Sequence, residues 1–451
     1  MINLDARINQ VNQGSDASQL LGRMMEKSAL AGKKDYVSSA QAMEILGVRK
    51  QTLYAYVSRG LIRSIKQPGR QERLYWRDDI ERMEARSLAR SGHGAVAASA
   101  MNWGEPIIPT SITEITPEGP RYRGRLAGDL ARMQVPFETV AELLWTGMWN
   151  DQATNWPVIA LKPELKRLAQ SLASPDAAEQ LLEIFALVTL QLGLSRGSVK
   201  ERVHGGQTLV SAREIIQTLV GCFGLATTKA AYVPMQDGQT IVQGLMRALS
   251  LDATEENYEA IQSMMTLFAD NELSPGALAV RVSASSGASL HACITSGICV
   301  SSGVQIGRFY DRVNDFLDDA RTKAALMKKA YDLQKRDISV PGFVHPLYPH
   351  GDPRAKYLFE VARRRASQSK ELVAIYGFVE EMSTKHEIYP RHELAILALT
   401  RAMGLPRQIP GALFVLARIA GWVAHVQEQR LTGSLLRPRG RFVGATVTEA
   451  F

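Results

Sequence analysis

Apolar residues recur at helical spacing through most of the chain beyond residue 104. The i, i+3, i+4 pattern is clear in segments 140–145, 181–187, 258–268 and 394–399. Such spacing is typical of amphipathic helices that bury one face in a core. The alternation that marks a strand is sparse outside residues 104–125. The pattern therefore predicts an all-α domain over residues 104–451.

The polar and apolar pattern near the N-terminus predicts a helix-turn-helix. Ser38 or Ser39 is suited to cap a short first helix that ends at Gly47. A second helix, Lys50 to Arg59, would bury Leu53 and turn its basic and amide side chains outward. In such a motif the second helix is the one that enters a major groove.

A two-stranded wing is predicted after these helices. Residues 61–76 alternate between apolar and polar on either side of Pro68-Gly69, with Arg70 and Arg73 near the tip. Basic, amide and aromatic side chains of this module are the candidate DNA contacts. They are Arg49, Lys50, Gln51, Tyr54, Arg59, Arg70 and Arg73.

Residues 36–86 resemble the winged helix-turn-helix of the MerR and excisionase families. The resemblance rests on the Leu-Gly-Val turn, the Arg-Gly-Leu-Ile that ends the second helix, and the Arg-Leu-Tyr strand before Asp-Asp-Ile. It implies binding to double-stranded DNA. The alternative is a small basic appendage used for oligomer packing. Residues 1–35 are expected to form a polar N-terminal arm, and residues 87–103 a linker.

Charge supports the DNA-binding interpretation. The net charge is +8, and residues 33–90 hold thirteen Lys and Arg against seven Asp and Glu. Most of the positive excess therefore lies in one short region, as expected of a nucleic-acid contact surface. No charge-free apolar run is long enough to span a membrane, and the start lacks a signal pattern, so we expect a cytoplasmic protein without a membrane partner.

The three cysteines do not predict a disulfide framework or a metal site. They are too few and too poorly spaced for either. Cys293 and Cys299 lie in an apolar run and are expected to be buried thiols. We expect no metal.

Several motifs of the long domain resemble the citrate synthase family and follow its order. They are segments 137–147, 277–288, 340–354, 390–406, 414–425 and 436–444. The resemblance implies a large and a small helical domain, the small one over about residues 308–415. It also implies a homodimer, and a Claisen condensation between an acyl-CoA and an oxaloacetate-like 2-oxo acid. The CoA thioester would be substrate or ligand, with no resident cofactor.

The resemblance assigns roles to residues of the oxo-acid half of the site. His345 matches the histidine that donates to the ketone oxygen. Arg354, Arg418 and Arg437 match arginines that bind the carboxylates, and Arg437 would come from the partner subunit. Contacts to CoA are implied at three neighbouring positions, Gly342, Phe343 and Val344.

The acyl-CoA half departs from the family. Glu393 stands at the position of the catalytic aspartate, and Ile306 replaces the histidine that stabilises the enol. Asn271 replaces a histidine that contacts the oxo acid. Gln305 or Arg308 could substitute for the lost donor. His392, next to Glu393 on a helix, is expected to be incidental, since successive helical residues face different ways.

Three functions remain open at this stage. The first is a DNA-binding regulator that senses a di- or tricarboxylate, or an acyl-CoA, without efficient turnover. The second is a divergent acyltransferase with Glu393 as base and His345 as acid. The third is a citrate synthase with a fused helical appendage, which Ile306 disfavours. The sequence leaves open whether the protein turns over.

Overall fold

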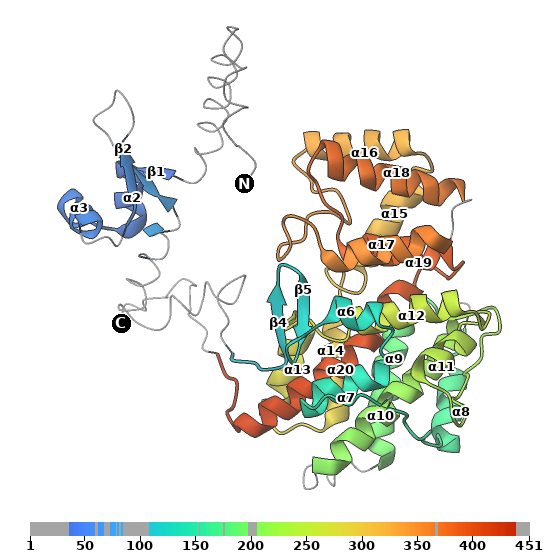
Figure 1. Cartoon of the computed structure of the whole chain (residues 1–451). Helices are drawn as coiled ribbons and strands as arrows, with labels where there is room; N and C mark the ends of the chain where they lie inside the picture. The colour runs from blue at the N-terminus through green and yellow to red at the C-terminus, as the bar shows by residue number, and fades with distance from the viewer. Residues whose placement is uncertain are drawn as a thin grey trace, which may run out of the picture. The chain divides into compact units, whose positions relative to one another are not determined.

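The computed structural model describes two compact units of the chain. The described residues are 36–58, 62–66, 73–77, 79–80, 83, 108–152, 154–174, 176–196, 205–365 and 369–438. The larger unit spans Thr110–Pro438 (Figure 1). The predicted arm, residues 1–35, and linker, residues 87–103, lie outside the described residues.

The smaller unit contains a helix-turn-helix and a three-stranded sheet. α2 (Ser39–Leu46) begins with a capping box, in which Ser38 and Gln41 satisfy each other's backbone N–H groups. It ends at Gly47, whose φ of 61° is the left-handed conformation that glycine adopts without strain. α3 (Lys50–Ser58) follows and buries Leu53. These features confirm both ends of the first helix, the turn and the start of the second helix, whose predicted end at Arg59 lies outside the described residues.

The wing is larger than predicted because a strand before α2 joins it. β2 (Ser64–Lys66) and β3 (Arg73–Trp76) pair antiparallel, and β1 (Tyr36–Ser38) pairs with the other edge of β3. The side chain of Arg63 makes two hydrogen bonds to the carboxylate of Asp79, at 2.8 and 2.9 Å. This ion pair ties the strand region to the segment that follows it.

The larger unit opens with a small sheet and is otherwise helical. The sheet is β4 (Thr113–Thr116), β5 (Gly119–Tyr122) and β6 (Arg125–Leu126), in that order. The helices before the site are α6 (Ala127–Arg132), α7 (Phe137–Thr146), α8 (Pro163–Ser171), α9 (Leu181–Arg196), α10 (Gly205–Cys222), α11 (Ile241–Ala248), α12 (Glu255–Leu267), α13 (Pro275–Ser285) and α14 (Leu290–Ser301). A 3₁₀ turn, Phe223–Ala226, follows α10. The predicted helices at 140–145, 181–187 and 258–268 are confirmed as α7, α9 and α12.

Six further α-helices follow in the described part of this unit. They are α15 (Phe309–Asp318), α16 (Lys323–Lys335), α17 (Pro353–Arg365), α18 (Lys370–Lys385), α19 (His392–Ala402) and α20 (Ile409–Thr432). α15 to α19 gather as one group at one end of the unit (orange in Figure 1), and the chain then returns through α20. The all-α prediction for this domain is confirmed.

α20 is the central helix of the core. Its Trp422 is 1% exposed and lies against Gly276 of α13 and Gly297 of α14, where a Cβ atom would meet the indole. The two glycines therefore allow three helices to pack closely around one large side chain. α20 and the segment 208–226 are long and apolar enough to cross a bilayer, but 94% and 83% of their apolar windows are buried inside the protein.

The expectation for the cysteines is partly wrong. Cys222 and Cys293 are buried, whereas Cys299 is exposed. Cys299 lies near the end of α14, on the helix face that turns away from the core, so its apolar sequence neighbours do not bury it.

Gly421→Ala should destabilise the protein by about 3 kcal/mol. A Cβ atom at Gly421 would overlap the buried carboxylate of Asp270, and overpacking beside an immobile charged group cannot relax easily. Unfolding in urea measures the loss. The matched control is Gly128→Ala in α6, where a Cβ would meet only Arg132 Nη1, at 3.4 Å, and the substitution should be neutral or slightly stabilising. Equal effects of the two substitutions would contradict this account of the α20 packing.

Candidate active site

The loop that carries His345 is anchored to the segment before α19. Arg391 N–H donates to Gly342 C=O at 2.8 Å, and Val344 N–H donates to Tyr389 C=O at 3.0 Å. Gly342 has φ of 83°, which suits glycine. Val344 has φ of 58° although its side chain is β-branched, and it is 56% exposed. The backbone is therefore strained next to His345.

His345 is a neutral hydrogen-bond donor. Burial, assisted by nearby His392 and Arg354, lowers its pKa to about 3. Its Nδ1 accepts the backbone N–H of Leu347 at 3.1 Å. A neutral imidazole whose Nδ1 accepts must carry its proton on Nε2. His345 therefore presents an N–H group from Nε2.

Asp352 organises the residues around His345. Its carboxylate receives Nε and Nη2 of Arg354 at 3.0 and 2.9 Å, and both side chains are buried. Burial alone would raise the pKa of Asp352, but Arg354 and the hydrogen bond from His392 hold it far below its usual range. Arg354 also donates from Nη1 to Asn271 Oδ1 at 2.8 Å. Two of the predicted ligand-binding residues, Arg354 and Asn271, are thus brought together.

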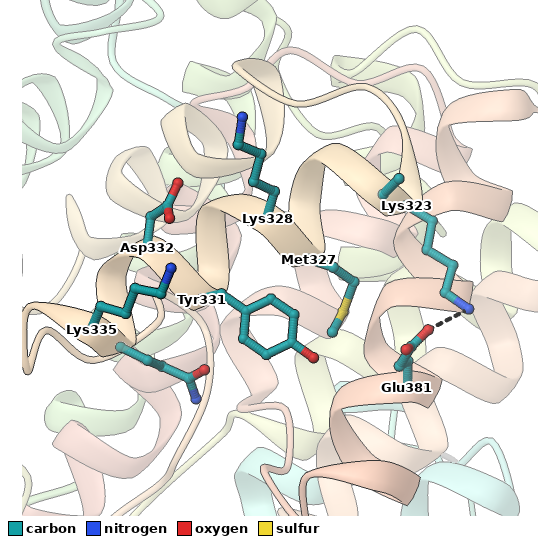
Figure 2. Close-up of a pocket in the computed structure, with 9 residues that line it drawn as sticks. Lys323, Met327, Lys328, Tyr331, Asp332, Lys335 and Glu381 are labelled. Atoms are coloured by element: carbon teal, nitrogen blue, oxygen red, sulfur yellow. Dashed lines mark ion pairs between the residues drawn. The ribbon is translucent and has the colours of Figure 1, made fainter.

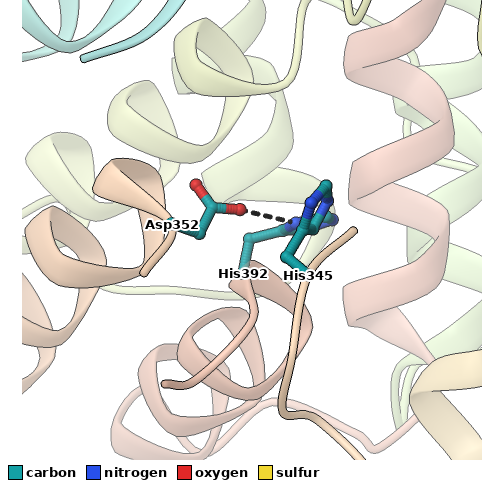
Figure 3. A group of neighbouring side chains, drawn as sticks. All are labelled: His345, Asp352 and His392. Atoms are coloured by element: carbon teal, nitrogen blue, oxygen red, sulfur yellow. Dashed lines mark hydrogen bonds and ion pairs between the residues drawn. The ribbon is translucent and has the colours of Figure 1, made fainter. Parts of the chain in front are cut away.

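His392 belongs to this cluster, so the expectation that it is incidental is wrong. Its Nδ1 lies 3.1 Å from Asp352 Oδ2 (Figure 3). The ring lies 5.6 Å from the ring of His345 and stacks on Phe414 at 5.9 Å. His392 is the first residue of α19, where side chains point back over the preceding loop rather than around a regular helical face. Sequence spacing could not show this contact because Asp352 is 40 positions away.

Arg418 is a buried cation with open hydrogen-bonding capacity. The residue is 3% exposed, and its Nε and Nη1 atoms have no hydrogen-bond partner among the described residues. Burial lowers its pKa to about 10, with Asp270 opposing the shift. Its guanidinium lies 4.8 Å from the ring of Phe414. Buried polar groups are normally paired, so an unpaired guanidinium here is suited to an anionic ligand.

Two tyrosines near the site were missed from the sequence. Tyr310 and Tyr348 are 2% and 3% exposed, and neither hydroxyl has a partner among the described residues. Tyr348 packs on His345 and on the guanidinium of Arg354, and Tyr310 lies against Phe414. Tyr348 lies within the 340–354 motif, but the resemblance assigned it no role, and none of the motifs includes Tyr310.

Glu393 is held by an arginine. Arg391 donates from Nε to Oε2 at 3.0 Å and from Nη2 to Oε1 at 2.5 Å. Burial alone would raise the pKa of Glu393, but the attraction of His392 and Arg391 and the hydrogen bonds of Arg391 lower it to about 2. Both oxygens of the predicted base are therefore occupied, and its basicity is reduced.

Neither Gln305 nor Arg308 supplies the missing enol-side donor. Ile306 is half-buried in the turn before α15. Arg308 donates to Glu183 of α9 at 2.6 Å, and Gln305 is exposed. Arg437 is exposed beyond α20, where its neighbour Leu436 donates its N–H to Ser285.

The His345, Asp352 and His392 cluster is not suited to a metal ion. One nitrogen or oxygen atom from each lies within 4.8 Å of the others, which is compatible with a metal site by distance alone. However, both oxygens of Asp352 bind Arg354, and Nε2 of His345 carries a proton. A cation would have to displace the guanidinium from Asp352, and binding at Nε2 of His345 would require its proton to move to Nδ1, which already accepts the N–H of Leu347.

An open groove lies elsewhere, along α16. Its volume is about 880 Å³, and its lining includes Lys323, Tyr331 and Lys335 of α16 with Glu381 of α18 (Figure 2). Lys323 and Glu381 form an ion pair at 2.7 Å. None of the lining residues belongs to the cluster around His345.

Most of the predicted DNA-contact residues that the structure describes are exposed at the start of α3. Arg49, Lys50, Gln51 and Tyr54 are exposed, at or within the first turns of α3, and Lys50 lies over the ring of Tyr54. Arg73 is partly buried and donates to Ser64. Arg59 and Arg70 lie outside the described residues.

The fold and these side chains define an all-α protein with a buried cluster of cationic and histidine side chains where two helical groups meet, and with a winged helix-turn-helix in the same chain. Residues 101–439 match the family described as "Citrate synthase, C-terminal domain", and residues 36–87 match "Helix-turn-helix domain". The chain therefore belongs to the citrate synthase family and carries an N-terminal helix-turn-helix of the MerR and excisionase kind.

Similar proteins are citrate and methylcitrate synthases. "Citrate synthase 2" of Bacillus subtilis is 25% identical over 378 residues, covering 75% of this chain and 95% of that protein. "2-methylcitrate synthase" of Shewanella oneidensis is 26% identical over 354 residues, covering 74% and 92%. Both relatives are matched over nearly their whole length.

Solved citrate synthases share the fold. The enzyme from Thermotoga maritima matches with a TM-score of 0.64 at 21% identity, covering 77% of this chain and 96% of that one. The enzyme from Thermoplasma acidophilum, in a ternary complex with carboxymethyl coenzyme A and oxaloacetate, matches with a TM-score of 0.66 at 19% identity, covering 79% and 98%. At these identities the likeness shows the fold alone.

Acid should destabilise the protein through His345. Because its folded pKa of about 3 lies below the ordinary 6.5, the unfolded chain binds a proton that the folded protein does not. The stabilisation is present above pH 6.5 and is lost as the pH falls toward 3, by about 2 kcal/mol between pH 6.5 and 5. Urea unfolding across this range measures it. His345→Gln should flatten the dependence and His350→Gln, at an exposed position of the same loop, should not; identical slopes in all three proteins would contradict the assignment.

Proposed function

We propose that the protein is a DNA-binding regulator whose citrate synthase-type site binds a di- or tricarboxylate without efficient condensation. The observation that carries the proposal is the contrast between two buried charges. Arg418 has nitrogens without a partner among the described residues, whereas both oxygens of Glu393 are occupied by Arg391. A site with an open cation and an occupied base favours binding over proton abstraction.

The carboxylate-binding half of the site supports this function. Arg354 is fixed by Asp352 and Asn271, and His345 offers an N–H group from Nε2. A ligand with a carboxylate and a neighbouring oxygen would satisfy Arg418 and His345 together. The structure of a similar protein with oxaloacetate and a coenzyme A analogue supports the choice of ligand class.

A divergent acyltransferase is the second candidate. The donor at His345 favours it, since a donor aimed at a ketone oxygen is what a condensing or cleaving reaction requires. Against it stand the paired Glu393 and the replacement of the enol-side histidine by Ile306. The loss of one such donor typically costs about 3 to 4 kcal/mol in the transition state. The regulator accounts for the helix-turn-helix as well.

A homodimer would complete the proposed regulator. α9 is apolar nearly all round, yet Leu187, Leu190 and Leu194 are 45%, 44% and 77% exposed. α14 packs against α9 and exposes Val300. Such a surface is suited to a second copy of the chain. A dimer would present two copies of α3 to a palindromic site, and it could supply Arg437 to the partner's site.

Coupling between ligand and DNA requires a difference between two states. The ligand must bind more tightly in the state that fits the operator, because equal affinity for both states shifts nothing. DNA binding would place the protein in the cytoplasm. An acyl-CoA could act as a second ligand next to Gly342, Phe343 and Val344, since Val344 is exposed at the loop surface.

Condensation should be slow, whereas carboxylate binding should be measurable. With acetyl-CoA and oxaloacetate, thiol release should be at least a hundredfold below a typical turnover of about 10 s⁻¹. Propionyl-CoA and other 2-oxo acids should behave alike. Turnover within tenfold of the typical value would favour the acyltransferase over the regulator.

In the same protein, citrate should raise the thermal unfolding temperature through Arg418. Arg418→Met should abolish this stabilisation because the open cation is lost. The control Arg308→Met removes an exposed arginine paired with Glu183 and should keep it. A response to citrate that survives Arg418→Met would place the ligand elsewhere.

Binding to DNA should depend on the exposed start of α3. Arg49→Ala and Lys50→Ala should each weaken binding to the DNA upstream of the protein's own gene and reduce the salt slope by about 1. Gel shifts at several salt concentrations measure both quantities. Lys356→Ala, an exposed position of the larger unit, is the control. If both α3 variants bind like the wild type, the module serves a different purpose.

A further inference from the structure

His392 occupies a place in the site that the family resemblance does not assign to it. It is the first residue of α19, it is 6% exposed, and its ring lies 5.1 Å from Phe268 and 5.6 Å from His345. Figure 3 shows its ring beside that of His345, with Asp352 on the other side. A small ligand that reaches one imidazole therefore comes close to the other.

The hydrogen-bonding state of His392 follows from Asp352. The carboxylate of Asp352 binds Arg354 with both oxygens, so it is ionised and can only accept. Nδ1 of His392 lies 3.1 Å from one of these oxygens. Two acceptors at that distance would repel each other, so Nδ1 must carry a proton. Arg354 Nη2, at a longer 3.4 Å, is then a close neighbour of Nδ1 and not its donor.

The other nitrogen of His392 is left as an acceptor. Burial lowers the pKa of His392, which keeps the ring neutral, so Nε2 has a lone pair and no proton. No described residue donates to Nε2; the contacts of the ring are those of Nδ1 and of the aromatic neighbours. The acceptor at His392 is therefore the opposite of the donor at His345.

A ligand that reaches Nε2 of both rings would thus meet a donor and an acceptor. A ketone oxygen can only accept, so it pairs with His345 and leaves Nε2 of His392 without a donor. A hydroxyl group can accept from His345 and donate to His392. We propose that His392 is the acceptor for a ligand hydroxyl, and that the site selects a 2-hydroxy carboxylate over the corresponding 2-oxo carboxylate, with Arg418 on the carboxylate. The inference rests on the proposed carboxylate-binding function.

The preference should be large because a bound ketone would cover the acceptor and leave it without a donor. An unpaired buried polar group costs about 1–3 kcal/mol, and sites built to bind a hydroxyl strongly reject analogues that lack it. We expect at least a tenfold difference in affinity.

Malate and oxaloacetate are a matched pair for the test, since they differ only at C2. Isothermal titration of the full-length protein, with each enantiomer of malate and with fresh oxaloacetate, should show one enantiomer binding at least tenfold more tightly than oxaloacetate. Equal affinities, or tighter binding of oxaloacetate, would overturn the inference while leaving the carboxylate site in place. If neither compound binds and citrate does not bind either, the proposed function itself fails.

His392→Phe keeps the aromatic packing on Phe414 and removes the acceptor. It should reduce the preference to less than threefold, by weakening malate and leaving oxaloacetate nearly unchanged. The control is His386→Phe, which removes a histidine that contacts Tyr331, outside the cluster. Unchanged malate affinity in His392→Phe would overturn the role of His392. The comparison of ligands on the wild-type protein decides the preference even if this variant does not fold.

Discussion

The buried carboxylate of Asp352 is the contact on which the candidate site depends. It accepts two hydrogen bonds from the Arg354 side chain, one from the Arg354 backbone N–H, and one from His392. Burying an unpaired ion costs several kcal/mol. The charges of Asp352 and Arg354 are therefore stable in the interior only because they are paired with each other. The carboxylate also fixes which nitrogen of His392 holds the proton. One side chain therefore determines the position of an arginine and the polarity of a histidine.

The rest of the site is arranged around that pair according to charge. Arg391 neutralises Glu393, and Arg354 neutralises Asp352. Arg418 has only longer-range attraction, chiefly to Asp270. Arg418 is thus the guanidinium of the cluster without a directly bonded carboxylate, and an arriving carboxylate would provide one. Of the three arginines expected to bind carboxylates, Arg354 is already paired with Asp352 and Arg418 is not, while the contribution of Arg437 from a partner subunit stays a prediction.

Local patterns in the sequence were sufficient for much of this architecture. Helical periodicity located α7, α9 and α12, and the Ser38 cap and Gly47 predicted both ends of α2. Contacts between distant positions could not be predicted in the same way. The pairing of β1 with β3 depends on the return of the chain 36 to 40 positions later, and the contact of His392 with Asp352 depends on the packing of a loop against a helix terminus. Neither of these two contacts produces a repeating pattern of residues that could be recognised in the sequence.

Val344 gives the loop an energetic character that its hydrogen bonds alone would not suggest. A β-branched residue with φ of 58° stores about 1–3 kcal/mol of backbone strain, and the exposed side chain recovers little by burial. The strain offsets part of the stability that the loop gains from its backbone hydrogen bonds to Arg391 and Tyr389. Rearrangement of the loop is therefore easier by the same amount, about 5- to 150-fold in equilibrium population. The segment that presents His345 is therefore held by hydrogen bonds but also carries backbone strain that favours its rearrangement.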